Sequence, residues 1–550
     1  MSAIAARICA ARSQIALAAS LFALLFLERL PAHDAPLSSL ADNWFWYMTG
    51  AATWTGICMI PIWLFGERTR FLYRIIPPVW LLITAVVWFF RLNFKAELGG
   101  VWIGIVAGSS SEETIWFLKT YFGWKACVTF ALIAAAIAAQ LRLASAVKSV
   151  GRLSVRIAAT IVAAAAFVHH THLWIDAGTI LWESPVTALV VDSAREWSHY
   201  KTLQLLRDEC ATPGDAVPAP GIDQSCFGVF VLGESASRSH WSLYGYERAT
   251  TPRMDAIRGE LAVFRDVVSP SMTTAKAMEL LLTTATLENR TDLRYTLPQV
   301  LARAGFGASL FSAQGRWGRF DGVESFAFAG CDPMIFAEEH VTKWPWYDDE
   351  LLPMLDSAAT NATLPTVAFL HLNGSHLPPG DKYPSDAVPF PHEDVPESYA
   401  TISVNNYDNS VFFTDALLGR IVDILKSRGG PTWMVYLSDH GESPDSKTWR
   451  TATDPDVWEV PMVIWLSDEY RLRFPETAAA VAAAAGKPLQ SDQLLTGFLH
   501  LTGVRGCGVG TSDDFLDASF VPRAVRMVED GRKTYDALRQ KRNSERETGK

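Results

Sequence analysis

Apolar residues are concentrated in the first 175 positions of the chain, where five hydrophobic stretches follow one another. A helix needs about 20 mostly apolar residues to cross a membrane, and tryptophans are typical of the ends of such helices. One stretch alone is also compatible with a buried core helix, but five in succession predict a transmembrane domain of five helices over residues 1–175. The stretches are Gln14–Leu27, Trp44–Phe65, Ile75–Phe90, Ala126–Leu143 and Ile157–Ile175.

Basic residues predict the orientation of these helices. They lie before the first stretch, between the second and third, and between the fourth and fifth. The positive-inside rule places these three positions in the cytoplasm, so an odd number of spans leaves the rest of the chain outside, which in a Gram-negative cell is the periplasm. Arg7 and Arg12 before a short apolar core also resemble a signal peptide, but no small-residue cleavage site follows Leu30. We therefore interpret the first stretch as an uncleaved anchor.

The next part of the chain, residues 176–222, predicts a connection between two domains. Ser184–Glu209 has mixed helical character and is predicted to lie at the membrane surface. Ala211–Gly221 is rich in proline and glycine and has no apolar period, which is typical of a linker. We expect a soluble domain over residues 223–538 and a charged, frayed tail over 539–550.

Short apolar runs alternate with helical patterns after residue 223. This alternation predicts an α/β domain with a largely parallel sheet. The predicted strands are Phe227–Leu232, Ala308–Phe311, Thr366–Leu370, Trp433–Leu437 and Pro461–Leu466. The predicted helices are Ala275–Leu287, Leu297–Ala304, Tyr407–Ser427 and Asp492–Leu501.

Composition adds two points. The net charge is −10, and we expect a membrane-embedded monomer with no nucleic-acid partner. Cys210, Cys226, Cys331 and Cys507 lie outside the apolar stretches, and an oxidising compartment permits disulfides among them. Four cysteines allow three connectivities, between which the sequence does not choose. No CxxC pair is present, so a zinc site built from thiolates is not expected.

Polar residues follow three of the predicted strands. Glu234 follows the first strand, His371–His376 follow a second, and Asp439 and His440 follow a third. Ligands of open α/β sheets bind beyond the carboxyl ends of the strands, and carboxylate and imidazole groups suit Zn²⁺. Gly441 makes a turn easy, so that Asp439 and His440 can face one metal. The alternative is an Asp that caps the next turn beside a solvent-facing His.

Hydroxyl groups precede one of the predicted helices. Thr273 and Thr274 come directly before the helix-forming run, where backbone amides and the helix dipole favour a phosphate group. A metal-bound threonine hydroxyl loses its proton far more easily than a free one. The alternative is a plain N-cap, the commonest use of threonine at this position.

These motifs together resemble the phosphoethanolamine transferases of Gram-negative inner membranes, which belong to the alkaline phosphatase/sulfatase superfamily. Ser312–Asp321 and Tyr347–Pro353 are more similar to the branch that acts on lipopolysaccharide core heptose than to the lipid A branch. The resemblance covers nearly the whole chain. The matching motifs are Gly233–Ser235, Ser242–Tyr246, Thr250–Pro252, Ser271–Ala275, His371–His376, Tyr407–Val411 and Leu437–Ser443.

The resemblance implies a role for each matching residue. It implies zinc ligands at Glu234, Thr274, Asp439 and His440, with Thr274 as the nucleophile. It also implies a position for His376 near the transferred phosphate or a second zinc. The residues that it implies near the substrate are Glu113, Gln314 and Asn373.

Two departures from the family pattern change what is expected. The asparagines that usually precede the glutamate matched by Glu113 are replaced in Ser109–Thr114. No histidine lies between His440 and Pro461, where lipid A enzymes carry one, so we expect one zinc and not a stable second.

The reaction implied is transfer of phosphoethanolamine from phosphatidylethanolamine to a lipopolysaccharide acceptor, through a covalent threonine intermediate. Core heptose, lipid A phosphate, a periplasmic glucan and a surface protein remain open as acceptors. The alternatives within the superfamily are a phosphoglycerol transferase and a hydrolase of the sulfatase or phosphodiesterase type. Sulfatases need C/S-x-P-x-R, and Ser269–Ala275 lacks the arginine. An inactive scaffold would not need the intact ligand positions.

Overall fold

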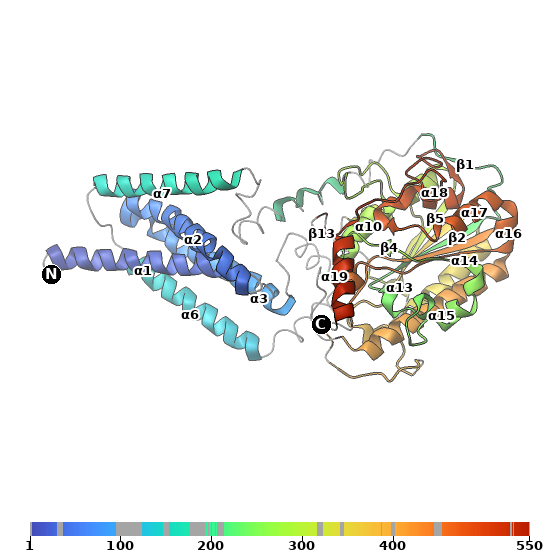
Figure 1. Ribbon diagram of the computed structural model, residues 1–550, viewed down its shortest axis with the longest axis horizontal. Helices are drawn as coiled ribbons and strands as arrows, with labels where there is room; N and C mark the ends of the chain where they lie inside the picture. The colour runs from blue at the N-terminus through green and yellow to red at the C-terminus, as the bar shows by residue number, and fades with distance from the viewer. Residues whose placement is uncertain are drawn as a thin grey trace. The chain divides into compact units, whose positions relative to one another are not determined.

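The computed structural model describes residues 3–29, 37–94, 124–146 and 153–175 and, with short gaps, 193–205 and 214–548. The main gaps in the last range are 316–322, 341–345, 398–401 and 445–453. The chain forms two compact units, Met1–Ser198 and His199–Lys550 (Figure 1). The predicted interfacial helix lies largely outside the described residues, and the domain boundaries predicted from the sequence stay predictions.

The first unit is helical, and each of the five predicted stretches falls within one helix. Helix α2 packs against α1 and α7, and α3 packs against α6. Apolar side chains of α1, α2, α3 and α6 form a small core. The bounds are α1 (Ala3–Arg29), α2 (Leu37–Phe65), α3 (Arg70–Phe94), α6 (Trp124–Ala146) and α7 (Leu153–Ile175).

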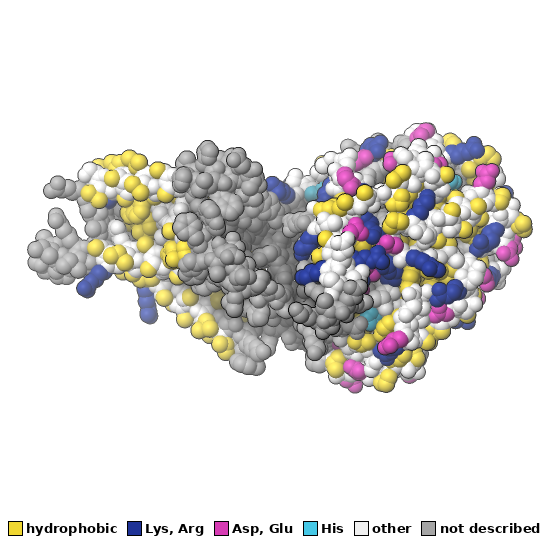
Figure 2. Space-filling model, in the orientation of Figure 1, with side chains coloured by type: hydrophobic (Ala, Val, Ile, Leu, Met, Phe, Trp, Pro, Cys, Tyr) yellow, Lys and Arg dark blue, Asp and Glu magenta, His cyan; other side chains and the backbone are white. Residues whose placement is uncertain are grey.

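Length and composition single out one helical stretch of this unit as able to cross a membrane. In the described part of the chain this is Met48–Phe89, which runs through α2, the short turn η1 (Gly66–Thr69) and α3. Ala11–Phe26, Phe130–Ala146 and Leu153–Ala166 are shorter apolar helices. The lengths of these apolar helices in the described residues therefore do not establish the predicted number of five spans. Figure 2 shows hydrophobic side chains over much of the described face of this unit.

A side chain of α3 enters the backbone of α2 beside a proline. Pro61 lies inside α2. The hydroxyl of Tyr73 accepts a hydrogen bond from the Ile62 amide at 3.2 Å and donates one to the Cys58 carbonyl at 2.7 Å. A side chain inserted into the helical hydrogen-bond ladder is one cause of a bend, and proline is another. The Tyr73 hydroxyl thus ties α3 to the proline turn of α2.

The second unit is built on a seven-stranded sheet with the order β3-β9-β8-β2-β7-β5-β6. Strands β8, β2, β7, β5 and β6 are mutually parallel, which confirms the predicted α/β class and the largely parallel sheet. All five predicted strands are present. The bounds are β2 (Phe227–Gly233), β3 (Leu261–Phe264), β5 (Gly307–Ser312), β6 (Met334–Phe336), β7 (Thr366–His371), β8 (Thr432–Ser438) and β9 (Met462–Leu466).

One strand runs against the predicted direction. The run Pro461–Leu466 was expected to be a parallel strand, but β9 pairs antiparallel with β8, with Leu437 opposite Met462. A parallel neighbour needs a crossover connection that is usually an α-helix. The described residues between Ser438 and Met462 contain only the short turn η8 (Pro455–Val457). The chain therefore returns directly beside the strand it has just left.

Helices cover both faces of the sheet (Figure 1). One apolar core joins the sheet to α10, α11, α17 and α18, and the other joins it to α9, α14 and α15. The predicted helices are confirmed, although α10 ends at Leu282 because Thr283 is extended and bridges to Thr296. The bounds are α9 (Pro252–Ala256), α10 (Thr274–Leu282), α11 (Leu297–Arg303), α14 (Leu352–Asn361), α15 (Val404–Arg428), α17 (Pro475–Ala484) and α18 (Leu495–Thr502).

Smaller elements complete the second unit. Three two-stranded ladders pair β1 with β11, β4 with β10 and β12 with β13. The strands are β1 (Val217–Pro218), β4 (Val267–Val268), β10 (Leu489–Gln490), β11 (Val504–Arg505), β12 (Met527–Val528) and β13 (Lys533–Thr534). The remaining helices are α12 (Val323–Ala327), α13 (Ala337–His340), α16 (Asp468–Arg473) and α19 (Tyr535–Thr548).

The structure can be compared with the predictions for the carboxyl-terminal tail and for the cysteines. The tail after residue 538 was predicted to be charged and frayed; its residues up to Thr548 belong to α19, in which Arg542 binds the buried Glu459. Cys226, Cys331 and Cys507 are free thiols, and Cys210 lies outside the described residues. Burial raises the pKa of the Cys507 thiol to about 11, so this thiol is a weak nucleophile at neutral pH.

Candidate active site

Two neighbouring strands deliver the central residues of the site. The last residues of β2 and β8, Gly233 and Ser438, lie opposite each other in the parallel ladder. Glu234 and Asp439 therefore leave the sheet at the same edge, where α/β proteins bind their ligands. Glu234, Asp439 and His440 each present one ligand atom, and these atoms lie within 4.8 Å of one another. All three side chains are buried.

The turn after Glu234 is made by Ser235, which has a left-handed backbone with φ of 56°. Its amide donates to Asp439 Oδ1 at 3.0 Å, and its hydroxyl donates to Glu234 Oε1 at 2.6 Å. Alternation along a strand predicts that Ser235 points away from the side used by Glu234. That prediction is wrong, because the left-handed residue ends the alternation and turns its hydroxyl back to the carboxylate.

Asp439 has one satisfied and one unsatisfied oxygen. Oδ1 accepts hydrogen bonds from the amides of Ser235 and His440, at 3.0 and 2.7 Å. Oδ2 is buried and has no hydrogen-bond partner. Buried carboxylate oxygens are normally hydrogen-bonded or bound to a metal, since the alternative is costly. The unsatisfied oxygen of Asp439 thus fits a cation in the cluster.

His440 is held in the tautomer that binds metals. Its Nδ1 lies 3.0 Å from the carbonyl oxygen of Gly441, which only accepts hydrogen bonds, so Nδ1 carries the proton. Nε2 of the neutral ring then keeps its lone pair and faces Glu234 Oε1 at 3.4 Å and Asp439 Oδ2 at 3.3 Å. A ligand histidine oriented by a carbonyl through its other nitrogen is typical of zinc sites. The alternative of a solvent-facing His440 is excluded, because the side chain is buried.

Thr274 brings its hydroxyl into the same cluster. Oγ1 donates to Glu234 Oε2 at 2.9 Å and lies 3.5 Å from His440 Nε2. Thr273 is the N-cap of α10 but makes no side-chain capping bond, and its hydroxyl lies 3.2 Å from Ser271 Oγ instead. Neither threonine therefore acts as a simple N-cap through its side chain.

Without a cation, the two buried carboxylates of Glu234 and Asp439 repel each other when both are ionised. Burial raises the pKa of Asp439 well above its usual range, and the nearby Glu234 charge raises it further. Burial also opposes the ionisation of Glu234, but the electrostatic influence of the neighbouring imidazole groups and hydrogen bonds from Ser235 and Thr274 hold its pKa below the usual range. One buried carboxylate is thus ionised at the expense of the other, and a divalent cation would stabilise both as anions. The donor set of two carboxylates, one imidazole and one hydroxyl fits Zn²⁺.

Three of the other predicted residues lie on the loops that follow β5 and β7. Gln314 Nε2 donates to the Leu372 carbonyl at 2.9 Å and lies 3.4 Å from Glu234 Oε2. Asn373 donates to the Ala313 carbonyl at 2.9 Å. His376 is half-buried, with Nδ1 3.0 Å from the Leu377 carbonyl oxygen. Glu113 lies outside the described residues, so the structure does not place it.

Two residues of the matching motifs have a supporting role that was not predicted from the sequence. The hydroxyl of Tyr407, in the first turn of α15, donates to the Ser235 carbonyl at 2.7 Å and accepts from the Ser237 amide at 2.8 Å. Ser438 Oγ accepts from the Ala236 amide at 2.9 Å and donates to the His440 carbonyl at 2.9 Å. Both side chains hold the turns that carry metal-ligand candidates. The signal was the polar Tyr407–Ser410 run at the start of an otherwise amphipathic helix.

Gly441 has a different role from the predicted one. It is not among the residues with a left-handed backbone. A Cβ atom at this position would lie 2.0 Å from the Asp456 carbonyl oxygen, a distance that no side chain can occupy. Glycine is therefore needed for the close approach of two backbone segments.

Asp348 supports the turn that carries Asn373. Its carboxylate accepts hydrogen bonds from the amides of Asn373 and Gly374 at 2.7 and 2.9 Å. Burial raises its pKa to about 6, although both amides oppose the shift. The folded state therefore holds this proton at pH values where the unfolded chain, with an aspartate pKa near 3.9, has lost it.

This shift predicts a pH dependence of stability. Because the folded pKa is raised, the contribution of Asp348 falls as pH rises from about 4 to about 6, by on the order of 3 kcal/mol. The variant Asp348→Asn has no such proton and should show a flatter dependence in that window. Thermal unfolding of the purified protein between pH 4 and 7 measures it, with Asp349→Asn, a more exposed neighbour, as control. Equal slopes in Asp348→Asn and wild type would contradict the prediction.

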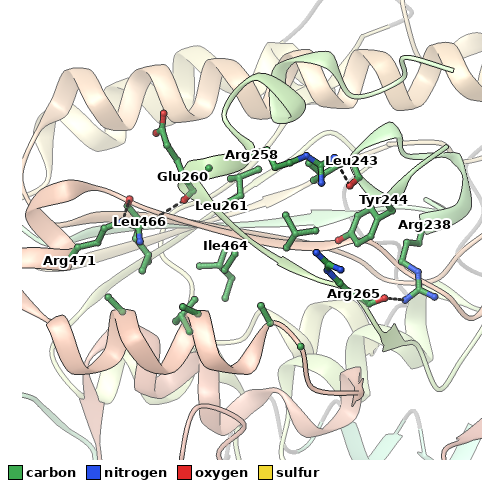
Figure 3. Close-up of a pocket in the computed structure, with 18 of the residues that line it drawn as sticks. Arg238, Leu243, Tyr244, Arg258, Glu260, Leu261, Arg265, Ile464, Leu466 and Arg471 are labelled. Carbon is green, nitrogen blue, oxygen red and sulfur yellow. Dashed lines mark hydrogen bonds between the residues drawn. The ribbon is translucent and has the colours of Figure 1, made fainter. Parts of the chain in front are cut away.

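A separate cavity of about 760 Å³ lies over the edge strand β3 and its neighbour β9 (Figure 3). Its walls combine guanidinium groups with apolar side chains of β3, β9 and α17. Arg238 borders this cavity and donates a hydrogen bond to the Arg265 carbonyl, as Figure 3 shows. In the described part of the unit, neither the Glu234–Asp439–His440 cluster nor Thr274 is among its lining residues.

The profile of the sulfatase family matches residues 227–504, which span half of the chain and carry the whole cluster. This chain belongs to the sulfatase family. The putative transferase YhbX of Escherichia coli strain K12 is 31% identical over 251 residues, or 44% of this chain and 43% of that protein. The chain thus matches less than half the length of this curated relative. The phosphoethanolamine transferase EptA of Helicobacter pylori is 25% identical over 414 residues, or 72% of this chain and 76% of that protein.

Solved structures share the fold of this family member. The lipooligosaccharide phosphoethanolamine transferase A of Neisseria meningitidis, an integral membrane protein, aligns with a TM-score of 0.65 over 92% of this chain and 99% of that chain, at 19% identity. The periplasmic domain of EptC from Escherichia coli, in complex with Zn, aligns with a TM-score of 0.51 over 60% of this chain and 98% of that domain, at 22% identity. The combination of a helical region and a sulfatase-like domain is thus confirmed as a fold.

Proposed function

We propose that this chain transfers phosphoethanolamine from phosphatidylethanolamine to a lipopolysaccharide acceptor, with one zinc ion bound by Glu234, Thr274, Asp439 and His440. The observation that carries the proposal is the Thr274 hydroxyl, 2.9 Å from Glu234 Oε2 at the first residue of α10. A hydroxyl there places a bound phosphoryl group next to free backbone amides. Relatives named as phosphoethanolamine transferases support the same reaction.

In the first half-reaction, Thr274 Oγ1 attacks the phosphorus of the donor lipid. Its proton passes to Glu234 Oε2, which already accepts its hydrogen bond. The bond from phosphorus to the glycerol oxygen breaks, and diacylglycerol leaves with a proton from His376. Phosphoethanolamine stays on Thr274 as an ester, which divides one transfer into two displacements. Zinc, when bound, would lower the pKa of the hydroxyl and neutralise charge on the phosphoryl oxygens.

In the second half-reaction, an acceptor hydroxyl or phosphate attacks the same phosphorus. His376 takes the acceptor proton, the bond to Thr274 Oγ1 breaks, and that oxygen recovers the proton held by Glu234. His376 therefore acts as acid in the first half and as base in the second. Gln314 lies 3.4 Å from Glu234 Oε2 and Asn373 binds the Ala313 carbonyl, next to Gln314 in the chain; we propose that both contact the acceptor.

We propose core heptose as the acceptor, on the basis of Ser312–Asp321 and Tyr347–Pro353. Mass spectrometry of lipopolysaccharide from cells with and without the protein tests this. We expect one added phosphoethanolamine on the core, absent from cells that carry Thr274→Ala. Release of free phosphoethanolamine from the donor lipid without a modified acceptor would show a hydrolase instead. A glycerophosphate adduct would show the phosphoglycerol alternative.

We propose a multi-pass inner-membrane protein with five spans in residues 1–175, a connection in 176–222 and a periplasmic catalytic domain from 223. A glutamate in the connection of residues 95–123, Glu113, would then face the periplasm close to the lipid donor.

This topology predicts the location of the carboxyl terminus. An alkaline phosphatase reporter fused after Lys550 should be active, because that enzyme matures only in an oxidising compartment. A green fluorescent reporter at the same position should be dark. The opposite pattern would mean an even number of spans.

A further inference from the structure

Four consecutive carbonyl groups of one short segment hold the loops that form the candidate active site. This segment, Asp456–Glu459, begins inside η8 and continues beyond its last residue, Val457. Each carbonyl oxygen accepts one hydrogen bond from a different position in the site. The bonds are Ser237 Oγ to the Asp456 oxygen at 3.0 Å, the Gly441 amide to Val457 at 2.9 Å, the Ser269 amide to Trp458 at 2.8 Å and the Arg238 amide to Glu459 at 3.0 Å.

The donors come from all three loops that carry candidate ligands. Ser237 and Arg238 follow Glu234, Gly441 follows His440, and Ser269 precedes Thr274. These loops leave different strands, and the Asp456–Glu459 segment is one place where all three are bound. Contact is close, because the Asp456 carbonyl occupies the space that a side chain at position 441 would need. A shift of this segment would therefore move all three loops at once.

The side chains of the segment are bound by α19. Arg542 Nη1 lies 2.5 Å from Asp456 Oδ1, and Arg542 Nη2 lies 2.9 Å from Glu459 Oε1. Tyr535, the first residue of α19, donates to the same Glu459 oxygen at 2.6 Å. The second oxygen, Oε2, binds Arg238 Nη2 at 2.6 Å. Glu459 is buried and Asp456 is half-buried, so these charges depend on their partners.

We propose that α19 positions the metal ligands and the nucleophile, with Arg542 as the positioning residue. Arg542 fixes Asp456 and Glu459 at the two ends of the segment, and the four carbonyls between and including them hold the loops of Glu234, Thr274 and His440. The inference rests on the proposed function only in taking this cluster as the zinc site. The rigid guanidinium of an arginine binds both carboxylates and so fixes the distance between them. The ammonium group of a lysine, at the end of a flexible side chain, does not fix that distance.

The test compares three variants of the full-length protein purified in detergent. Arg542→Met removes the charge and keeps the length. Arg542→Lys keeps the charge without the fork. Arg539→Met is the matched control, because Arg539 lies one turn earlier in α19 and binds Asp266, which lies outside the segment. Zinc affinity is measured by chelator competition, and amide hydrogen exchange of the metal-free protein is followed in peptides that contain Ser269 or Gly441.

We expect Arg542→Met to bind zinc at least about 10-fold more weakly, the loss typical when a group that orients metal ligands is removed. Exchange at Ser269 and Gly441 should become faster in the metal-free state. Arg542→Lys should recover part of the affinity, and Arg539→Met should match wild type. Lower thermal stability of Arg542→Met with unchanged zinc affinity and unchanged exchange would show a purely structural role and overturn the proposal.

A second variant covers the case in which Arg542→Met does not fold. Asp456→Asn removes one of the two carboxylate partners and leaves the contacts of Glu459 with Tyr535 and Arg238. It should weaken zinc binding in the same direction, and wild-type affinity in this variant would also overturn the proposal. Wild-type protein that binds zinc but transfers nothing would contradict the proposed function alone, since neither affinity nor exchange depends on transfer.

Discussion

Thr274→Ala is expected to abolish transfer, by three or more orders of magnitude, and to leave the fold unchanged. The substitution removes the hydroxyl and one methyl group, and enzymes that lose a covalent nucleophile lose activity on that scale. With phosphatidylethanolamine and no acceptor, the wild-type protein should accumulate the ester, and peptide mapping should find the added mass on Thr274. The variant should show no adduct.

Neighbouring hydroxyls provide the controls for this experiment. Thr274→Ser keeps a hydroxyl on the same backbone position and should retain a measurable fraction of activity. Thr273→Ala should still form the adduct, because the Thr273 hydroxyl lies against Ser271 and not against the carboxylates. Ser235 is the more demanding control, since its hydroxyl lies 2.6 Å from Glu234 Oε1. An adduct on Ser235 or Thr273, or one that persists in Thr274→Ala, would contradict the assignment.

Asp439→Asn and His440→Ala are each expected to remove stoichiometric zinc and with it the activity. Asp439 Oδ2 has no hydrogen-bond partner, and the proton on His440 Nδ1 leaves a lone pair on Nε2. Both atoms face the centre of the cluster, where they lie 3.3 Å apart. Removal of residues that only support a ligand already costs 10- to about 100-fold in affinity, so loss of a ligand should cost more. Metal analysis of the purified variants measures it directly.

A buried carboxylate elsewhere in the domain separates loss of metal from loss of stability. Asp415 in α15 accepts the amides of Arg253 and Met254 at 2.7 and 2.9 Å and does not belong to the cluster. Asp415→Asn makes the same chemical change as Asp439→Asn and should lower stability while zinc stays bound. Full zinc content with full activity in both ligand variants would show that the metal site lies elsewhere.

Strand ends were the most predictable part of the site. The runs at Phe227, Thr366 and Trp433 are apolar, β-branched and bounded by polar residues, so both the strands and the ends that carry Glu234, His371 and Asp439 follow from local pattern. Their convergence follows from the parallel ladder, in which Gly233 lies opposite Ser438. The buried and metal-directed state of His440 needed the structure, because the Asp439–His440 pair is also compatible with an exposed turn.

The direction of β9 and the role of α19 depend on contacts distant in sequence. An apolar run shows that Met462–Leu466 is a strand but not which way it runs beside β8. Helix α19 is strongly polar, and its few apolar residues do not predict that it packs against the rest of the domain. It is held by Arg539 and Arg542, which bind carboxylates far earlier in the chain, at Asp266, Asp456 and Glu459. The orientation of Ser235 was wrongly predicted for a related reason, since its backbone binds Asp439, which follows β8, and Tyr407 of α15.

The dependence of the site on α19 has a consequence for biosynthesis. Helix α19 follows every other described helix of this unit in the chain and supplies the partners of Asp456 and Glu459, whereas Glu234 and Thr274 are made near the beginning of the same unit. Contacts between such distant positions form late in folding, after the intervening chain is available. A nascent or truncated chain is therefore expected to lack an assembled ligand set. Zinc acquisition should follow synthesis of α19, so products that stop before this helix should remain metal-free and inactive.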